Sequence, residues 1–322
     1  MADNNMKKFV KITKICLINI CLFALLFLVS EVLSVAVLYK EWSFLNLDFS
    51  KKTVQKFFLL KKGIYEEVFD YRPTEYKKRS RKKPIVLFGC SFVYGHGLSE
   101  DELFSRQLSD YTKRTVYNKG LPGGGCASML YLLRKPEFKK EIPNAEYFIY
   151  TYIPEHLRRV YTNSPEWFNE YLFAAYKMLP DGKLKEVKLN NFKLRLASTA
   201  SYKLFHNYYS RLRVSAFNND FKLFFTVVKE SVNLIREQYP DSKFVILVFD
   251  NYKGNDYPFS LEEEEALFNK FAEENNVKVL YTKKMNKGED LLNGKYNGAD
   301  GFHPSGEAWK IIVPQLSKEL KL

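Results

Sequence analysis

Short apolar runs alternate along the chain with stretches in which apolar residues recur every three or four positions. The runs are rich in β-branched and aromatic residues, which is typical of strands that are buried on both faces of a sheet. They cover residues 85–88, 115–118, 147–153, 243–249 and 277–282. The stretches with helical spacing cover residues 99–108, 130–133, 221–238, 261–274 and 305–320. Strands that alternate with helices predict a three-layer α/β/α sandwich around a mainly parallel, five-stranded sheet.

The first 39 residues have the pattern of a membrane anchor. A polar and basic tail covers residues 1–14, and an apolar segment with a single charge, Glu31, covers residues 15–39. At about 1.5 Å per helical residue, this segment can cross a hydrocarbon core of roughly 30 Å. A cleaved signal peptide is the alternative, but no small-residue cleavage site follows the apolar core. We therefore expect one transmembrane helix that contacts membrane lipid, and the lysines of the tail favour a cytoplasmic N-terminus with the main domain outside.

A connector at residues 40–83 is expected to lead into one main domain at residues 84–322. The connector ends in the basic run KKRSRKK at residues 77–83. We interpret this run as a solvated linker, and binding to anionic head groups or to a glycan is the alternative.

Residues 161–217 interrupt the alternation of strands and helices, and we interpret them as an insertion. Within it, the Pro-Asp-Gly turn at 180–182 predicts a hairpin over residues 175–188. Aromatic residues at helical spacing predict a helix over residues 201–214. This helix would either pack into the core or form a lid over a site.

A candidate nucleophile follows the first apolar run of the main domain. Gly89 lets the backbone turn at the end of the run, so that Ser91 lies just past the carboxyl end of a parallel strand. In an open α/β sheet this edge is where ligands bind. A serine hydroxyl needs a base within hydrogen-bond reach, and that base needs a group that orients it. Asp300 and His303, three residues apart near the C-terminus, can supply both.

Three segments of the main domain together resemble the SGNH/GDSL hydrolases. They read GCSFVYG at residues 89–95, NKGLPGG at 118–124 and DGFHPSG at 300–306, in the order that this family uses. The resemblance implies a flavodoxin-like strand order. It also implies that Ser91 is the nucleophile of a triad with His303 and Asp300, and that the N–H groups of Ser91 and Gly120 hold the oxyanion.

The chain departs from the family pattern at two places. Cys90 stands where the family usually has Asp, and the segment YFIYTYIPEHLRR at residues 147–159 lacks the Asn that usually donates to the oxyanion. His156 is the nearby side chain that could replace this donor. Loss of one such donor costs other acyl-transfer enzymes about 10²–10³ in rate.

Composition narrows the choice of partner. The formal net charge of +13 over 322 residues favours an anionic surface such as phospholipid or an acidic glycan. The basic residues are scattered and no nucleic-acid-binding motif is present, so we do not expect nucleic acid as a partner. We also expect no metal and no cofactor, because metal-ligand spacings, phosphate loops and dinucleotide fingerprints are absent from the sequence. Cys90 and Cys126 are interpreted as small, semi-buried side chains, with a bridge between them as the alternative.

Together these patterns predict a membrane-anchored serine esterase or O-acyltransferase that acts on an acylated glycan or lipid. The alternative is a catalytically impaired module that binds a glycan or a partner enzyme, and Cys90 and the missing Asn motivate it. His96, close after Ser91, is interpreted as a structural residue of a glycine-flanked turn, and a second base is the alternative there.

Overall fold

The computed structural model describes residues 19, 21–23, 25–30, 75–76, 82–160, 175–187, 217–249, 260–286, 288, 290–292, 294–298 and 301–322. The chain divides into two compact units, one formed by Met1–Lys62 with Asn190–Leu212 and the other by Gly63–Leu189 with Arg213–Leu322. In the described part of the first unit, residues 21–23 and 25–30 are helical. The described residues contain no helix that is both long and apolar enough to cross a membrane. Most of the predicted anchor, and all of the predicted helix at 201–214, lie outside the described residues.

The described part of the second unit is built around one sheet. Its strands are β1 (Glu75–Tyr76), β2 (Ile85–Gly89), β3 (Val116–Gly120), β4 (Tyr147–Tyr152), β7 (Lys243–Val248) and β8 (Lys278–Tyr281). Their order across the sheet is β1-β3-β2-β4-β7-β8, and β1 alone runs antiparallel to its neighbour. The five parallel strands therefore follow the order 2-1-3-4-5, which is the flavodoxin-like order. These five strands are the five that the sequence predicts. β1, in contrast, comes from the stretch that the sequence assigns to the connector.

Side chains alternate between two separate apolar cores, one on each face of the sheet. In β2, Val86 and Phe88 belong to one core, whereas Ile85 and Leu87 belong to the other. Residues of β4 and β7 alternate in the same way. Successive side chains of a strand point to opposite faces, so a strand that is buried on both faces is mainly apolar. This requirement explains the apolar runs of β2, β4 and β7, whereas β3, which reads VYNKG, also carries Asn118 and Lys119.

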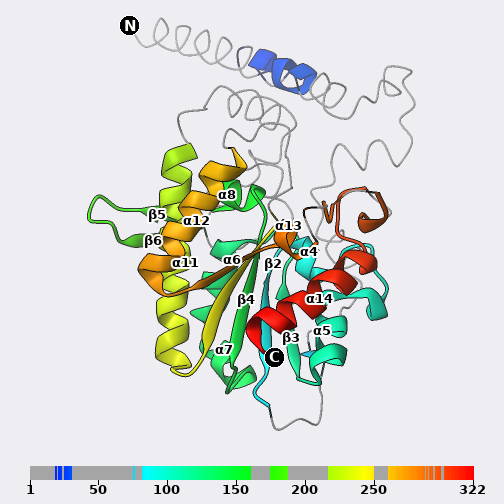
Figure 1. Cartoon of the computed structure of the whole chain (residues 1–322). Helices are drawn as coiled ribbons and strands as arrows, with labels where there is room; N and C mark the ends of the chain where they lie inside the picture. Colours follow the sequence, from blue (N-terminus) through cyan, green and yellow to red (C-terminus); the bar gives the residue numbers. More distant parts are fainter. Residues whose placement is uncertain are drawn as a thin grey trace, which may run out of the picture. The chain divides into compact units, whose positions relative to one another are not determined.

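Helices cover both faces of the sheet. The core that contains Val86 is covered by α6 (Cys126–Leu133), α7 (Pro136–Glu141), α8 (Glu155–Arg159), α11 (Phe217–Gln238) and α12 (Leu261–Asn275). The other core is covered by α4 (Ser91–Tyr94), α5 (Phe104–Thr112) and α14 (Gly306–Leu320). Figure 1 shows α11 and α12 on one side of the sheet and α5 and α14 on the other. The predicted three-layer sandwich is confirmed for the described residues.

Two short helical segments differ from the prediction. The helix predicted over 99–108 is split into the 3₁₀ helix η2 (Glu100–Glu102) and α5, because Leu103 between them is extended and completely buried. Its side chain occupies the space over Gly95, where an added Cβ would lie 2.0 Å from Leu103 Cδ2. The sequence also misses α7, in which Pro136 begins a helix, a position that suits its fixed φ.

A separate two-stranded hairpin is formed by β5 (Ala175–Met178) and β6 (Leu184–Val187). It lies beside α11 (Figure 1), and Tyr176 of β5 is buried in the core beneath it. The turn between the strands is the predicted Pro-Asp-Gly turn, with Gly182 at φ +81°. The hairpin prediction is therefore confirmed.

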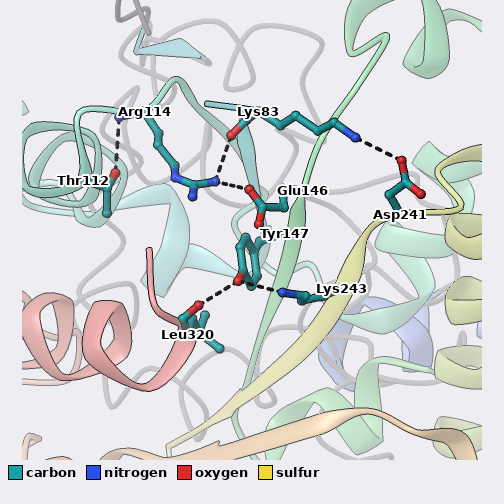
Figure 2. Close-up of polar contacts among 8 residues, drawn as sticks. All are labelled: Lys83, Thr112, Arg114, Glu146, Tyr147, Asp241, Lys243 and Leu320. Carbon is teal, nitrogen blue, oxygen red and sulfur yellow. Dashed lines mark hydrogen bonds and ion pairs between the residues drawn. The ribbon is translucent and has the colours of Figure 1, made fainter. Parts of the chain in front are cut away.

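Polar contacts fasten the amino ends of the parallel strands (Figure 2). The Arg114 guanidinium, just before β3, donates to the Lys83 carbonyl before β2 and to the Glu146 carboxylate before β4. Its side chain is 6% exposed, so its charge-assisted hydrogen bonds are worth about 1.5–3 kcal/mol, less the screening at the 29% exposed Glu146. The Lys83–Asp241 ion pair, at 47% and 84% exposure, falls in the surface class at about 0–1 kcal/mol. Arg114 is therefore the stronger of these two links.

A second link at the same end joins the sheet to the last helix (Figure 2). The Tyr147 hydroxyl donates to the Leu320 carbonyl at 2.7 Å and accepts from Lys243 Nζ at 3.3 Å. These contacts fix the end of α14 on β4 and β7. The candidate site lies at the opposite edge of the sheet, at the carboxyl ends of the strands.

Candidate active site

Ser91 lies at the carboxyl edge of the sheet, where the sequence predicts it. β2 ends at Gly89, Cys90 is extended and buried, and Ser91 is the first residue of α4. The side chain of Ser91 is half-buried. Its N–H is at the first position of a helix, where no carbonyl of the helix can accept it. Ser91 therefore presents both a hydroxyl and a backbone donor at this edge.

His303 meets Ser91 across 212 positions of sequence. His303 Nε2 lies 2.7 Å from Ser91 Oγ, which is a hydrogen bond. The loop that carries His303 is fixed on both sides, because Gly298 N–H donates to the His303 carbonyl at 2.7 Å and Ser305 N–H donates to the Tyr296 carbonyl at 2.8 Å. Ser305 then caps α14 by accepting from Ala308 N–H. Asp300, the predicted third member of the triad, lies outside the described residues.

The aromatic rings of Phe92, Phe302 and His96 lie next to His303. Phe92 is buried beneath it, with ring centroids 5.4 Å apart, and Phe302 packs edge-on at 5.1 Å. Phe302 itself is 40% exposed. The ring of His96 lies 4.9 Å from that of His303 and is exposed. The imidazole is thus held in place by Phe92, while Phe302 and His96 form a surface beside it.

The side chain of Asn118 fastens the end of β3 to the turn that carries Ser91. Its Nδ2 donates to the Val93 carbonyl at 2.9 Å and to Ser105 Oγ at 3.1 Å. Its Oδ1 accepts from Gly120 N–H at 3.0 Å. An added Cβ at Gly120 would lie 2.5 Å from the backbone nitrogen of Tyr94, so only glycine allows α4 to approach β3 this closely.

The geometry at Gly120 requires a correction of the sequence-based assignment of the oxyanion donor. Its N–H is buried and occupied by Asn118 Oδ1, so it is not available to a substrate oxygen. Gly120 allows α4 to pack closely against β3. The oxyanion donor is therefore a later residue of the loop.

The hydrogen bonds of the following loop single out Gly123. Leu121 N–H donates to the Gly89 carbonyl, Gly124 N–H to the Leu121 carbonyl and Gly125 N–H to Ser128 Oγ. Pro122 has no N–H. Among the described residues, none accepts from Gly123 N–H.

The turn at residues 121–124 explains why Gly123 N–H has no acceptor among the described residues. Pro122 stands at its second position, Gly123 at its third with φ +68°, and the Gly124 N–H to Leu121 O bond of 2.7 Å closes it. These are the features of a type II turn, which needs positive φ at the third position. The N–H of that residue points out of the turn. The Pro-Gly pair in the sequence carries this signal, and the sequence-based prediction missed it.

The position of His156 requires a second correction. β4 is followed by the single turn α8, which directs His156 into the core, where it is completely buried. Its Nδ1 pairs with the Tyr150 hydroxyl at 2.6 Å, and its Nε2 has no solvent-accessible surface. Burial, followed by the nearby Arg159 charge, lowers the pKa of His156 well below 6.5. His156 is therefore a neutral core residue and cannot donate to a substrate at the Ser91 edge.

Cys90 and Cys126 are both buried and both free, so no bridge joins them. Burial raises the pKa of the Cys126 thiol, which keeps it protonated. Within the described ranges, no cluster of histidine, cysteine, aspartate and glutamate has the arrangement of a metal site.

No family model matches the chain, and no curated protein matches it. Solved structures with a similar fold include an acetyl xylan esterase from Butyrivibrio proteoclasticus, with 12% identity, a TM-score of 0.42 and coverage of 76% of this chain and 65% of that one. They also include a member of the lipolytic G-D-S-L family from Veillonella parvula, with 11% identity, a TM-score of 0.43 and coverage of 73% and 96%.

A family two carbohydrate esterase from Clostridium thermocellum, solved with cellohexaose, has 11% identity, a TM-score of 0.43 and coverage of 74% of this chain and 63% of that one. The chain therefore spans less than two thirds of the length of this esterase and of the acetyl xylan esterase. The G-D-S-L family is the one that the sequence motifs resemble.

The burial of His156 predicts a pH dependence of stability. Its pKa in the folded chain is below the unfolded value of about 6.5, so the unfolded chain takes up the proton first as pH falls. His156 therefore contributes fully to the free energy of unfolding above pH 6.5. This contribution decreases as the pH falls below 6.5, by at most about 1.4 kcal/mol per pH unit. In His156→Gln this part of the slope should vanish. Urea unfolding of both proteins at pH 8.0, 6.5 and 5.5 measures it, and equal slopes would contradict the assignment.

Proposed function

We propose that the chain is a membrane-anchored serine esterase or O-acyltransferase acting on an acylated glycan or lipid. The observation that carries the proposal is the 2.7 Å hydrogen bond between His303 Nε2 and Ser91 Oγ at the carboxyl edge of a flavodoxin-like sheet. A serine hydroxyl that is bonded to an imidazole, with a helix N–H beside it, is the arrangement that acyl transfer needs.

In the first half of the proposed reaction, Ser91 Oγ attacks the acyl carbonyl carbon while His303 Nε2 takes the hydroxyl proton. Asp300, three residues before His303, would hold the other ring nitrogen and stabilise the imidazolium. His303 Nε2–H then gives the proton to the leaving alcohol oxygen as the C–O bond breaks. The product is an acyl-enzyme on Ser91.

In the second half, water or a hydroxyl of an acceptor loses a proton to His303 Nε2 and attacks the acyl carbon. Ser91 leaves and regains the proton. Hydrolysis and transfer thus share every group of the site, and they differ only in the molecule that enters beside His303.

The proposed oxyanion donors are the N–H groups of Ser91 and Gly123. Among the described residues, none accepts a hydrogen bond from either N–H group. Because His156 is buried, no third donor is assigned. The family that the sequence resembles usually has a further donor, an Asn side chain, and its absence from residues 147–159 supports the alternative of an impaired binding module.

The rings beside His303 bear on the substrate. The alcohol oxygen of the ester must reach His303 Nε2, so the alcohol part of the substrate passes along the flank of this residue. Phe302 and His96 form that flank, and both are exposed. An apolar ring next to a group that can donate and accept hydrogen bonds suits a large hydroxylated alcohol, such as a sugar or a lipid head group.

Membrane anchoring is part of the proposal. The helical residues of the first unit expose large apolar side chains, with Phe23 72% and Leu26 60% exposed. Such a surface is expected to be covered by lipid.

Resistance of the full-length chain to extraction from membranes at alkaline pH tests the anchor, and its release as a soluble protein would contradict it.

Labelling with a fluorophosphonate, read by intact mass, tests the nucleophile. The full-length chain should gain one adduct, and Ser91→Ala should gain none. His303→Gln and Asp300→Asn should react at least 10²-fold more slowly, because the base or its orientation is lost. Ser99→Ala, which changes an exposed serine outside the site, serves as the control and should react as the wild type does. A folded wild type without an adduct would favour the binding module, and an adduct on Ser91→Ala would refute the assignment.

A pair of acetate esters tests the alcohol side. Ethyl acetate and a mono-O-acetylated methyl glucopyranoside share the acyl group and differ in the size of the alcohol. Phe302→Ala should lower kcat/KM for the sugar ester about tenfold more than for ethyl acetate, since a lost apolar contact of this size is worth that factor. Tyr111→Ala is the matched control, because Tyr111 is a 56% exposed aromatic residue on α5. Equal losses for the two esters would show that Phe302 only supports His303.

A further inference from the structure

α8 lies directly against the loop that carries Gly123. Arg159 Nη1, at the end of this single turn, donates to the Gly124 carbonyl at 3.0 Å. The ring of His156, near its start, lies against Gly125, where an added Cβ would be 3.4 Å from His156 Cγ. Two residues of α8 thus hold two successive residues of the loop.

His156 is itself held in place by two tyrosines of β4. Its Nδ1 pairs with the Tyr150 hydroxyl of β4 at 2.6 Å, and its ring packs at right angles to that of Tyr152. Tyr152 donates to the buried carboxylate of Glu264 on α12 at 2.6 Å. The support under the loop is therefore continuous with β4 and α12.

The turn at residues 121–124 is attached at both ends. At its start, Leu121 N–H donates to the Gly89 carbonyl, two residues before Ser91. At its end, the Gly124 carbonyl accepts from Arg159. The first attachment sets the turn relative to the nucleophile, and the second prevents its far end from swinging away. Gly123 lies between them.

We propose that Arg159 and His156 are positioning residues that hold Gly123 N–H where the oxyanion of the reaction develops. This proposal rests on the proposed function, and it gives α8 a role other than that of a direct donor. The segment after β4 acts on the oxyanion through the backbone of the neighbouring loop. Because an oxyanion donor works only within a few tenths of an ångström of its position, loosening the loop slows the chemical step and leaves substrate binding almost unchanged.

A comparison of an ester with the matching thionoester separates this role from a general loss of structure. The thionoester places sulfur, a weak hydrogen-bond acceptor, at the position of the oxyanion. An enzyme with a formed oxyanion site prefers the oxygen ester, and the ratio of the two kcat/KM values reports on the donor geometry. A change that only reduces the amount of folded enzyme lowers both values by one factor and leaves the ratio unchanged.

In the full-length chain, Arg159→Ala should lower kcat for an aryl acetate about 10–100-fold with KM within a factor of two, and the oxygen-to-sulfur ratio should fall toward one. Arg159→Lys keeps a charged donor and should recover most of both losses. Arg106→Ala removes an arginine that pairs with Asp110 on α5, and it should change neither quantity.

An unchanged oxygen-to-sulfur ratio in Arg159→Ala would overturn the proposal, whatever the loss in rate. If Arg159→Ala does not fold, the ratio in Arg159→Lys and Arg159→Gln decides, and the proposal requires it to fall in the order wild type, Lys, Gln. A wild type that forms the Ser91 adduct but shows no preference for the oxygen ester overturns this proposal alone. A folded wild type without adduct or turnover overturns the proposed function as well.

Discussion

The close approach of α4 to the end of β3 is the constraint on which the rest of the site depends. β2 and β3 end side by side, with Gly89 paired to Gly120, and α4 begins immediately on top of them. A side chain at Gly120 would collide with the backbone of Tyr94. With that space empty, Asn118 can reach the Val93 carbonyl and lock the first turn of α4 to the sheet. These contacts alone fix the position of the Ser91 hydroxyl, without the other parts of the site.

The strands and the place of Ser91 could be predicted from the sequence for one physical reason, whereas His303 was identified from its spacing to Asp300 and from the motif DGFHPSG. A strand that is buried on both faces is mainly apolar, and parallel strands bring their carboxyl ends to one edge. The residues that follow such runs therefore collect at that edge, whatever their separation along the chain. His303 reaches the edge because its loop precedes a helix, α14, that packs back on the same face of the sheet.

The oxyanion donors could not be predicted from the sequence in this way, because they depend on contacts that no pattern of apolar residues encodes. Gly120 is excluded by one side-chain oxygen, that of Asn118, and His156 by the direction in which a single helical turn points it. Leu103 likewise ends η2 because its side chain packs into the space that Gly95 leaves free. In each case the local sequence permits several arrangements, and tertiary packing selects one. Gly123 was open to prediction, since the Pro-Gly pair indicates a type II turn.

The two-residue strand β1 has a consequence for how molecules of this protein meet one another. An uncovered edge strand offers unpaired N–H and C=O groups to any other chain. Glu75 and Tyr76 occupy the outer groups of β3 at Tyr117 and Val116, and they do so in the antiparallel sense. A truncated protein that began at Pro84, the start of the main domain judged from its first apolar run, would lack this cover. Its β3 edge would be open to edge-to-edge association, so a soluble version of the domain should begin before residue 75.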